Sequence, residues 1–137
     1  MEFGQIKKIK EKFSLAAKVR GFFVADFFRN SIVHWTLIAS IFINAADWAA
    51  LTYFIRPVDF PIILHYNVYF GVDIIGDWWQ AYFLPLIGII MLIINTLLAY
   101  FFFKQKERIA SYLLLLTAII IQAGIAIASA SIILINY

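Results

Sequence analysis

Long apolar stretches alternate with short polar ones along this chain. Three of the apolar stretches, residues 32–55, 81–103 and 109–135, reach the roughly 20 residues that a helix needs to cross the hydrocarbon core of a bilayer. A loop, residues 56–80, separates the first stretch from the second, whereas only the turn "KQKER", residues 104–108, separates the second from the third. The pattern predicts an all-α integral membrane protein with three transmembrane helices, the last two of them antiparallel neighbours.

Residues 1–30 have a different pattern. Apolar positions recur there at helical spacing, at Ile6, Ile9, Phe13, Ala17 and Val24. Basic residues fill the other face, which is typical of a helix lying on an anionic cytoplasmic leaflet rather than of one that binds nucleic acid. We therefore predict an amphipathic interfacial helix in residues 1–30 and a three-span membrane domain in residues 31–137. The expected contacts with lipid head groups are Lys7, Lys8, Lys10, Lys12, Lys18 and Arg20.

Composition and charge agree with a membrane protein and give it an orientation. Of the 137 residues, 64% are hydrophobic and 14% are charged, whereas a soluble domain has about 25% charged residues. Residues 1–30 hold seven of the eleven Lys and Arg, the turn 104–108 holds three, and the loop 56–80 holds only Arg56. The positive-inside rule then places the N-terminus and the turn in the cytoplasm, and the loop and Tyr137 outside the cell membrane. The absence of cysteine excludes disulfides and thiolate metal sites.

Polar and small residues form one stripe along each predicted span. On the first span the stripe is Thr36, Ser40, Asn44 and Asp47. On the second it is Pro85, Gly88, Leu92, Asn95 and Ala99, and on the third it is Ser111, Ala118, Gln122, Ala126 and Ser129. The spacing of three and four residues puts each set on one helical face. Because polar side chains are costly in lipid, we expect the stripes to face one another, with Asn44, Asn95 and Gln122 exchanging hydrogen bonds near the bilayer centre.

Asp47 leaves two interpretations of the stripes open. In the first, the stripes serve helix packing, and the acid reaches water or pairs with Arg56. In the second, the Asn44/Asp47 stripe carries a proton or a cation through a homo-oligomer, since three helices are too few to enclose a pore. Packing is favoured for a monomer. The outer half of the third span, "QAGIAIASASIILINY", is rich in small residues and suits contact with a protein partner or a second copy.

The loop contains "PIILHYNVYFGVDIIGDWW", residues 61–79, which mixes aromatic and polar side chains. The candidates for binding outside the membrane are His65, Tyr66, Asn67, Asp73, Asp77 and Trp78. In an extended segment His65 and Asn67 point the same way, and Asp73 or Asp77 can return to them across a turn at Gly71, which would give a set of N and O metal ligands. A lone histidine with scattered carboxylates is a poor metal signature. A connector at the membrane interface is therefore favoured, and no metal or cofactor is predicted.

Catalytic signatures are absent from the sequence. It has no Gly-rich phosphate loop, no nucleophile elbow and no HExxH motif. The two histidines, His34 and His65, fall on opposite sides of the membrane in the predicted topology, so they cannot share a site within one chain. We predict that the protein is not an enzyme and has no catalytic residues.

The order of residues in the loop resembles a known family. The residues that carry the resemblance are Pro61, His65, Tyr66, Asn67, Gly71, Asp73, Gly76, Leu84 and Pro85. They are similar to a short membrane domain found in the sporulation-delaying-peptide immunity proteins and in related small membrane proteins. The resemblance is limited to residues 61–85, and the spacing from Asn67 to Gly71 is one residue longer than in that pattern. It implies an integral membrane protein that senses or neutralises an extracellular peptide, and it implies no catalytic residues.

The hypothesis that follows is a small non-catalytic membrane protein that acts through contacts. It would serve either as an accessory subunit of a membrane complex or as a peptide-sensing, immunity-type factor. The alternative is a homo-oligomeric transporter or channel that uses the Asn44/Asp47 stripe.

Overall fold

The computed structural model describes residues 26–137. The predicted amphipathic helix of residues 1–30 lies almost entirely outside this range, and its head-group contacts lie wholly outside it. The described elements are α2 (Asp26–Arg29), α3 (Ser31–Phe54), β1 (Ile62–Asn67), β2 (Gly71–Gly76), the 3₁₀ helix η1 (Trp78–Tyr82), α4 (Phe83–Lys104) and α5 (Arg108–Asn136). The chain divides into two compact units after His34, and the second unit, from Trp35 onward, contains the candidate sites.

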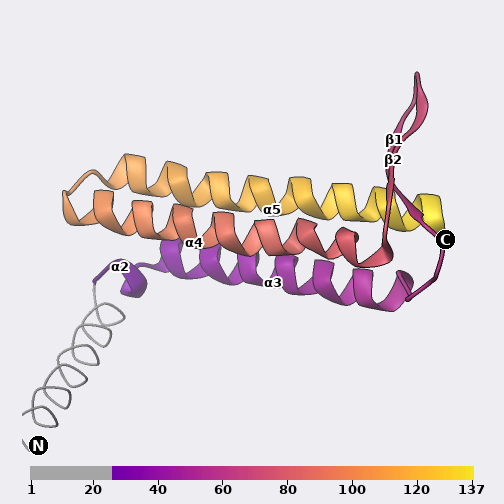
Figure 1. Cartoon of the computed structure of the whole chain (residues 1–137). Coiled ribbons are helices and arrows are strands. Elements are labelled where there is room, and N and C mark those ends of the chain that lie inside the picture. The colour runs from indigo at the N-terminus through magenta and orange to yellow at the C-terminus, as the bar shows by residue number, and fades with distance from the viewer. Residues whose placement is uncertain (1–25) are drawn as a thin grey trace, which may run out of the picture. The chain divides into compact units, whose positions relative to one another are not determined.

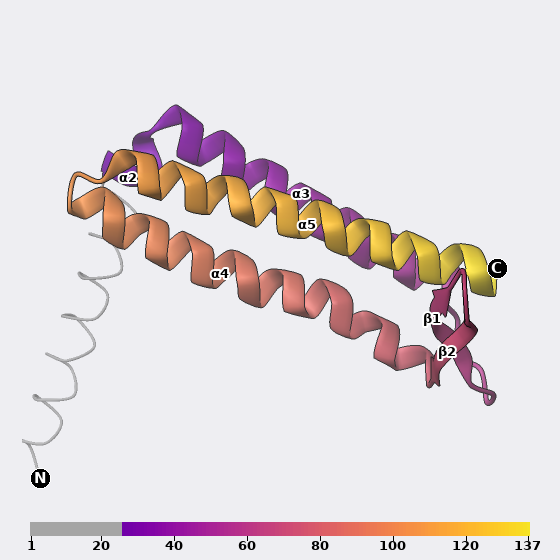
Figure 2. The same ribbon diagram turned by 90° about the horizontal axis from the view of Figure 1, so that it is seen from above.

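Each long helix begins or ends at a local signal. The side-chain oxygen of Asn30 accepts hydrogen bonds from the backbone N–H groups of Ile32 (3.0 Å) and Val33 (3.4 Å), which caps the start of α3. In the turn between α4 and α5, Lys106 adopts φ of 67°, which helps to reverse the chain. Within the second unit α4 and α5 run antiparallel and side by side, next to residues 35–54 of α3 (Figures 1 and 2).

The bundle buries polar residues among apolar ones and exposes many large apolar side chains. The buried positions of α4 are Pro85, Gly88, Leu92, Asn95 and Ala99, and the buried polar residues of the second unit are Ser40, Asn44, Asp47, Asn95, Ser111, Gln122 and Ser129. Large apolar side chains such as Phe42 and Leu134 point outward instead. The apolar outer surface suits an apolar environment, and three helices are long and apolar enough to cross a membrane: α3, α5 and the stretch Trp78–Lys104.

The expected all-α fold is incomplete, because residues 62–76 form an antiparallel β-hairpin. Strand β1 pairs with β2 from Ile62 opposite Gly76 to Asn67 opposite Gly71, with irregular register around His65. Gly71 has φ of +79°, a conformation that disfavours other residues, and it directly follows the tip. The hairpin projects sideways from the helices, across their direction, at the end where α5 finishes (Figures 1 and 2).

A small apolar core and one asparagine hold the hairpin to the helices. Leu51, Ile55, Ile62, Ala81 and Ile132 are buried together where α3, β1, η1 and α5 meet. Near the end of α5, the side-chain amide of Asn136 donates to the Ile63 carbonyl at 2.7 Å and accepts from the Ile63 N–H at 2.9 Å. These two bonds pair with β1 as a neighbouring strand would, so the base of the hairpin is fixed to α5.

Candidate functional site

Two side-chain amides join all three helices in the interior of the bundle. Asn44 of α3 donates through Nδ2 to the Pro85 carbonyl of α4 at 2.9 Å and to Oε1 of Gln122 at 3.0 Å. Gln122 of α5 donates through Nε2 to the Gly88 carbonyl at 2.8 Å. Asn44 is 5% exposed and Gln122 is 1% exposed, so these bonds form away from any solvent. We call Asn44, Gln122 and the two carbonyls the amide network.

The amide network depends on the absence of a side chain at Gly88. A Cβ atom added there would lie 2.7 Å from Nδ2 of Asn44 and 2.9 Å from Oε1 of Gln122. Both distances are shorter than carbon normally approaches these atoms. Glycine at this position therefore lets the two amides reach the backbone of α4.

The other members of the polar stripes lie in the interior but make more local contacts. Asn95 donates to the Met91 carbonyl of its own helix at 2.9 Å, so it does not join Asn44 and Gln122 as expected. The reason is axial position, because Asn95 lies seven residues, or about 10 Å, further along α4 than Gly88. The hydroxyls of Ser40 and Ser111 are buried and have no hydrogen-bond partner among residues 26–137, while Thr36 and Ala126 are half-buried.

Asp47 lies at the edge of the interior rather than at its centre. Its Oδ2 accepts a hydrogen bond from the Ser129 hydroxyl of α5 at 3.1 Å, and the residue is 5% exposed. It does not pair with Arg56. Asp47 also lines a groove of about 280 Å³ on the surface between α3 and α5. The other residues that line this α3/α5 groove are Phe42, Ile43, Ala46, Ala50, Ala126, Ala130 and Ile133.

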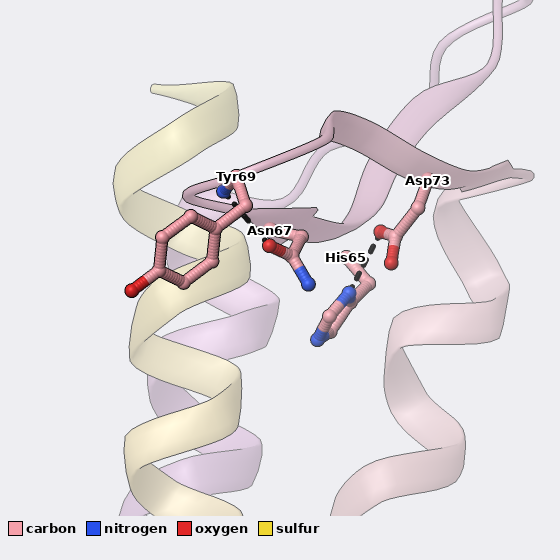
Figure 3. Close-up of polar contacts among 4 residues, drawn as sticks. All are labelled: His65, Asn67, Tyr69 and Asp73. Atoms are coloured by element: carbon pink, nitrogen blue, oxygen red, sulfur yellow. Dashed lines mark hydrogen bonds and ion pairs between the residues drawn. The ribbon is translucent and has the colours of Figure 1, made fainter.

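On the hairpin, the structure brings together two of the residues predicted from the loop. Nδ1 of His65 and Oδ1 of Asp73 are 2.7 Å apart across the two strands (Figure 3). Both side chains are exposed, at 57% and 39%, so the pair is screened by solvent. With its proton on Nδ1, His65 donates to the carboxylate and leaves Nε2 without a partner among residues 26–137.

Three further loop candidates have structural roles. Asn67 accepts the Tyr69 N–H through Oδ1 at 2.9 Å, which shapes the hairpin tip (Figure 3). The Asp77 N–H donates to Oε1 of Gln80 at 3.1 Å, and the Asp77 carboxylate accepts from the Trp79 indole at 3.2 Å, at the start of η1. Trp78 packs edge-on against Tyr82.

The last loop candidate, Tyr66, borders a pocket beneath the hairpin. The pocket has a volume of about 360 Å³ and lies against the ends of α4 and α5 that are nearest to the hairpin. Its polar lining residues are His65, Tyr66, Gln80 and Ser131, and its other lining residues are apolar. No group of three or more His, Asp or Glu side chains lies close enough to hold a metal ion anywhere in residues 26–137. The pocket thus combines His65 and Tyr66 of the hairpin with apolar residues of α4 and α5, a lining that suits an amphipathic ligand.

The tip of the hairpin and Asn136 are features that sequence reasoning did not single out. Val68, Tyr69 and Phe70 form the tip and are 85%, 91% and 85% exposed. Asn67 and Gly71, which flank these residues, are turn-forming types and are the signal for such a tip once a hairpin is expected. Asn136 had a weaker signal, a single amide at the end of a long apolar segment.

The chain matches no protein-family model, no curated protein and no solved structure in the comparisons made with it. The resemblance of residues 61–85 to the immunity-type membrane domain thus rests on the loop residues alone.

Proposed function

We propose that the protein is a multi-pass membrane protein in which α3, α4 and α5 cross the bilayer. At about 1.5 Å per residue, helices of 24, 22 and 29 residues exceed the roughly 30 Å of hydrocarbon that they must cross. The outward apolar surface and the internal amide network support this proposal. In hydrocarbon, polar groups must find partners inside the protein, and Asn44 and Gln122 have done so.

The proposed orientation places the hairpin outside the cell. Lys104, Lys106 and Arg108 lie at the turn between α4 and α5, at the opposite end of these helices from the hairpin. The hairpin end carries Arg56 together with three acids, Asp59, Asp73 and Asp77. The excess of basic residues on cytoplasmic loops supports the placement of the turn in the cytoplasm.

In this proposal the protein acts through contacts and has no catalytic activity. The observation that carries it is the contrast between the interior and the hairpin. Asn44 and Gln122 use their amide groups to bond the helices to one another. The hairpin tip, in contrast, exposes Val68, Tyr69 and Phe70 almost fully. Clustered exposed apolar side chains are typical of sites that bind a protein, a peptide or the membrane interface. The role would be that of an accessory subunit or of a peptide-sensing, immunity-type factor.

One observation favours the alternative of transport by a homo-oligomer. Asp47 lines the surface groove between α3 and α5, where a second copy would bring it into a shared path. Against this, Asn44 and Gln122 close the interior of the single bundle with hydrogen bonds to backbone carbonyls. Contact function is therefore the stronger proposal.

The test is extraction from native membranes in a mild detergent, followed by native mass spectrometry of what travels with the chain. A photo-crosslinking side chain at Tyr69 is compared with one at Leu97, which is exposed on α4 away from the hairpin. Contact function predicts a discrete protein or peptide adduct from Tyr69 and only lipid adducts from Leu97. A homo-oligomer whose ion flux is abolished by Asp47→Asn would replace the contact proposal with transport.

A further inference from the structure

The α3/α5 groove has walls that would admit another helix. Four of its lining residues are alanines, two from each helix: Ala46, Ala50, Ala126 and Ala130. Small side chains let helix backbones approach closely, and in lipid close packing is a main source of helix association. The groove opens on the surface of the bundle, where the hydrogen bond between Ser129 and Asp47 joins α5 to α3.

Asp47 lines the groove, and only one of its two carboxylate oxygens accepts a hydrogen bond within residues 26–137. Oδ2 of Asp47 accepts the Ser129 hydroxyl, and Oδ1 has no partner among residues 26–137. Asp47 is nevertheless only 5% exposed, and the other residues that line the groove are apolar. An acid within a membrane segment is costly, and such acids pair with other groups or face a polar path. The groove thus lacks a donor opposite Oδ1.

No Lys or Arg of residues 26–137 forms an ion pair with Asp47. Among residues 31–103 the sequence contains one Lys or Arg, Arg56, which lies nine residues after Asp47. The seven residues from Asp47 to the end of α3 at Phe54 span about 10 Å, which is further than an arginine side chain reaches, and Arg56 lies beyond that end. A second copy inserted in the same orientation would carry its Arg56 at the same height, so it would not meet Asp47 either.

We propose that the α3/α5 groove is the docking site for a transmembrane helix of another protein, which places a lysine or arginine beside Asp47. The alanine walls accommodate the helix backbone, and the ammonium or guanidinium group donates to Oδ1 of Asp47. This inference rests on the membrane embedding and accessory role proposed above, and it adds the chemistry of the partner. The hairpin is not part of this site, because no hairpin residue lines the groove.

The test uses the full chain in lipid vesicles with synthetic transmembrane peptides of leucine and alanine. One position of the peptide, chosen to lie at the same depth in the bilayer as Asp47, is lysine, glutamine or leucine. Because the sequence contains no cysteine, a single Ala50→Cys variant can report docking by disulfide formation with a cysteine in the peptide after an oxidant is added. Leu86→Cys is the matched control, since Leu86 is exposed on α4 and does not line the groove.

The expected result is cross-linking at Ala50→Cys at least tenfold faster with the lysine peptide than with the leucine peptide, and no preference at Leu86→Cys. Asp47→Asn keeps the shape and an acceptor for Ser129, so it should remove the preference for lysine without unfolding the bundle. Ala126→Leu should block docking of every peptide while leaving Asp47 in place. Equal cross-linking by the lysine and leucine peptides, or a preference that survives Asp47→Asn, would overturn the proposal. Failure of the chain to insert into vesicles would instead overturn the membrane function on which it rests.

Discussion

Replacing Gly88 by alanine should weaken the bundle, although the same change usually strengthens a helix. The added Cβ would lie 2.7 Å from Nδ2 of Asn44 and 2.9 Å from Oε1 of Gln122. Both amides must then withdraw from α4, which removes the bonds to the Pro85 and Gly88 carbonyls and strains the bond between the amides. One substitution therefore disturbs all three interhelical bonds of the amide network.

The expected magnitude follows from those three bonds. Interhelical hydrogen bonds in membrane proteins contribute about 0.6 kcal/mol each on average and at most about 1.7 kcal/mol. Loss of the network thus costs about 2 to 5 kcal/mol in the free energy of unfolding. Alanine is favoured over glycine in a helix by roughly 0.5 to 1 kcal/mol, which offsets part of this loss. We expect Gly88→Ala to destabilise the bundle by about 1 to 4 kcal/mol.

The chain offers a matched control for this substitution. A Cβ added at Gly124 of α5 meets no atom within 4 Å, so Gly124→Ala should be neutral or stabilising by up to about 1 kcal/mol. The measurement is reversible unfolding of both variants in mixed micelles, followed by helical circular dichroism. Equal free energies of unfolding for Gly88→Ala and Gly124→Ala would refute the role given to the amide network.

A double-mutant cycle separates the network from a simple clash. Asn44→Ala removes the nearer of the two amides that a Cβ at Gly88 would meet. The Asn44→Ala variant also lacks two of the three bonds of the amide network before Gly88 is changed. The cost of Gly88→Ala should therefore fall by about half in the Asn44→Ala background. Additive costs would mean that the two residues act independently.

Three further predictions concern the hairpin. Asn136→Leu removes both bonds to Ile63, each worth about 1 kcal/mol. Hydrogen exchange at the Ile63 amide should therefore accelerate at least tenfold. Unchanged exchange would show that these bonds to α5 do not hold the hairpin in place. Gly71→Ala should destabilise the hairpin by about 1 kcal/mol and Gly71→Asn by less, as seen in the exchange of β2 amides, because φ is +79° with open space around the position. Asp73→Asn should change the free energy of unfolding by less than about 1 kcal/mol, since the His65 pair is exposed; a larger loss in the same micelle assay would contradict this.

The helices and their buried faces were predictable because the polar residues recur at helical spacing within long apolar segments. A polar residue every three or four positions defines one helical face, and that face has to be internal if the surroundings are apolar. Ser40, Asn44 and Asp47 on α3, and Gln122 and Ser129 on α5, are accordingly buried. Helical periodicity alone was enough for this step.

The choice of partners within the interior was not predictable from periodicity. Periodicity gives the angle of a residue around its helix but not its height relative to residues of other helices. The axial position of each α4 residue relative to the other helices depends on where α4 begins. The residues directly before α4 form the tighter 3₁₀ helix η1 (Trp78–Tyr82). Asn44 therefore meets Gln122 and the backbone near Gly88, whereas Asn95 lies about two turns away and bonds within its own helix.

The β-hairpin was missed because its sequence lacks the usual signals. "IIL" at residues 62–64 is continuously apolar, so β1 shows no alternation, and the register is irregular around His65. The tip also lacks an Asn-Gly or Asp-Gly pair, the strongest short-range signal of a hairpin. Part of what stabilises the strand is distant in sequence, since Asn136 bonds to Ile63 across 73 residues.

Asp47 is the residue that the fold alone explains least. Its contact with Ser129 needs only a hydrogen-bond acceptor, and an asparagine would provide one with a neutral side chain. A carboxylate in a membrane helix costs about 2.5 to 3.5 kcal/mol relative to an apolar residue by insertion scales. The amide network already holds α3 to both other helices without it. The extra cost is offset if a cationic group enters the α3/α5 groove, and the alanines that border Asp47 leave room for the helix that would carry it.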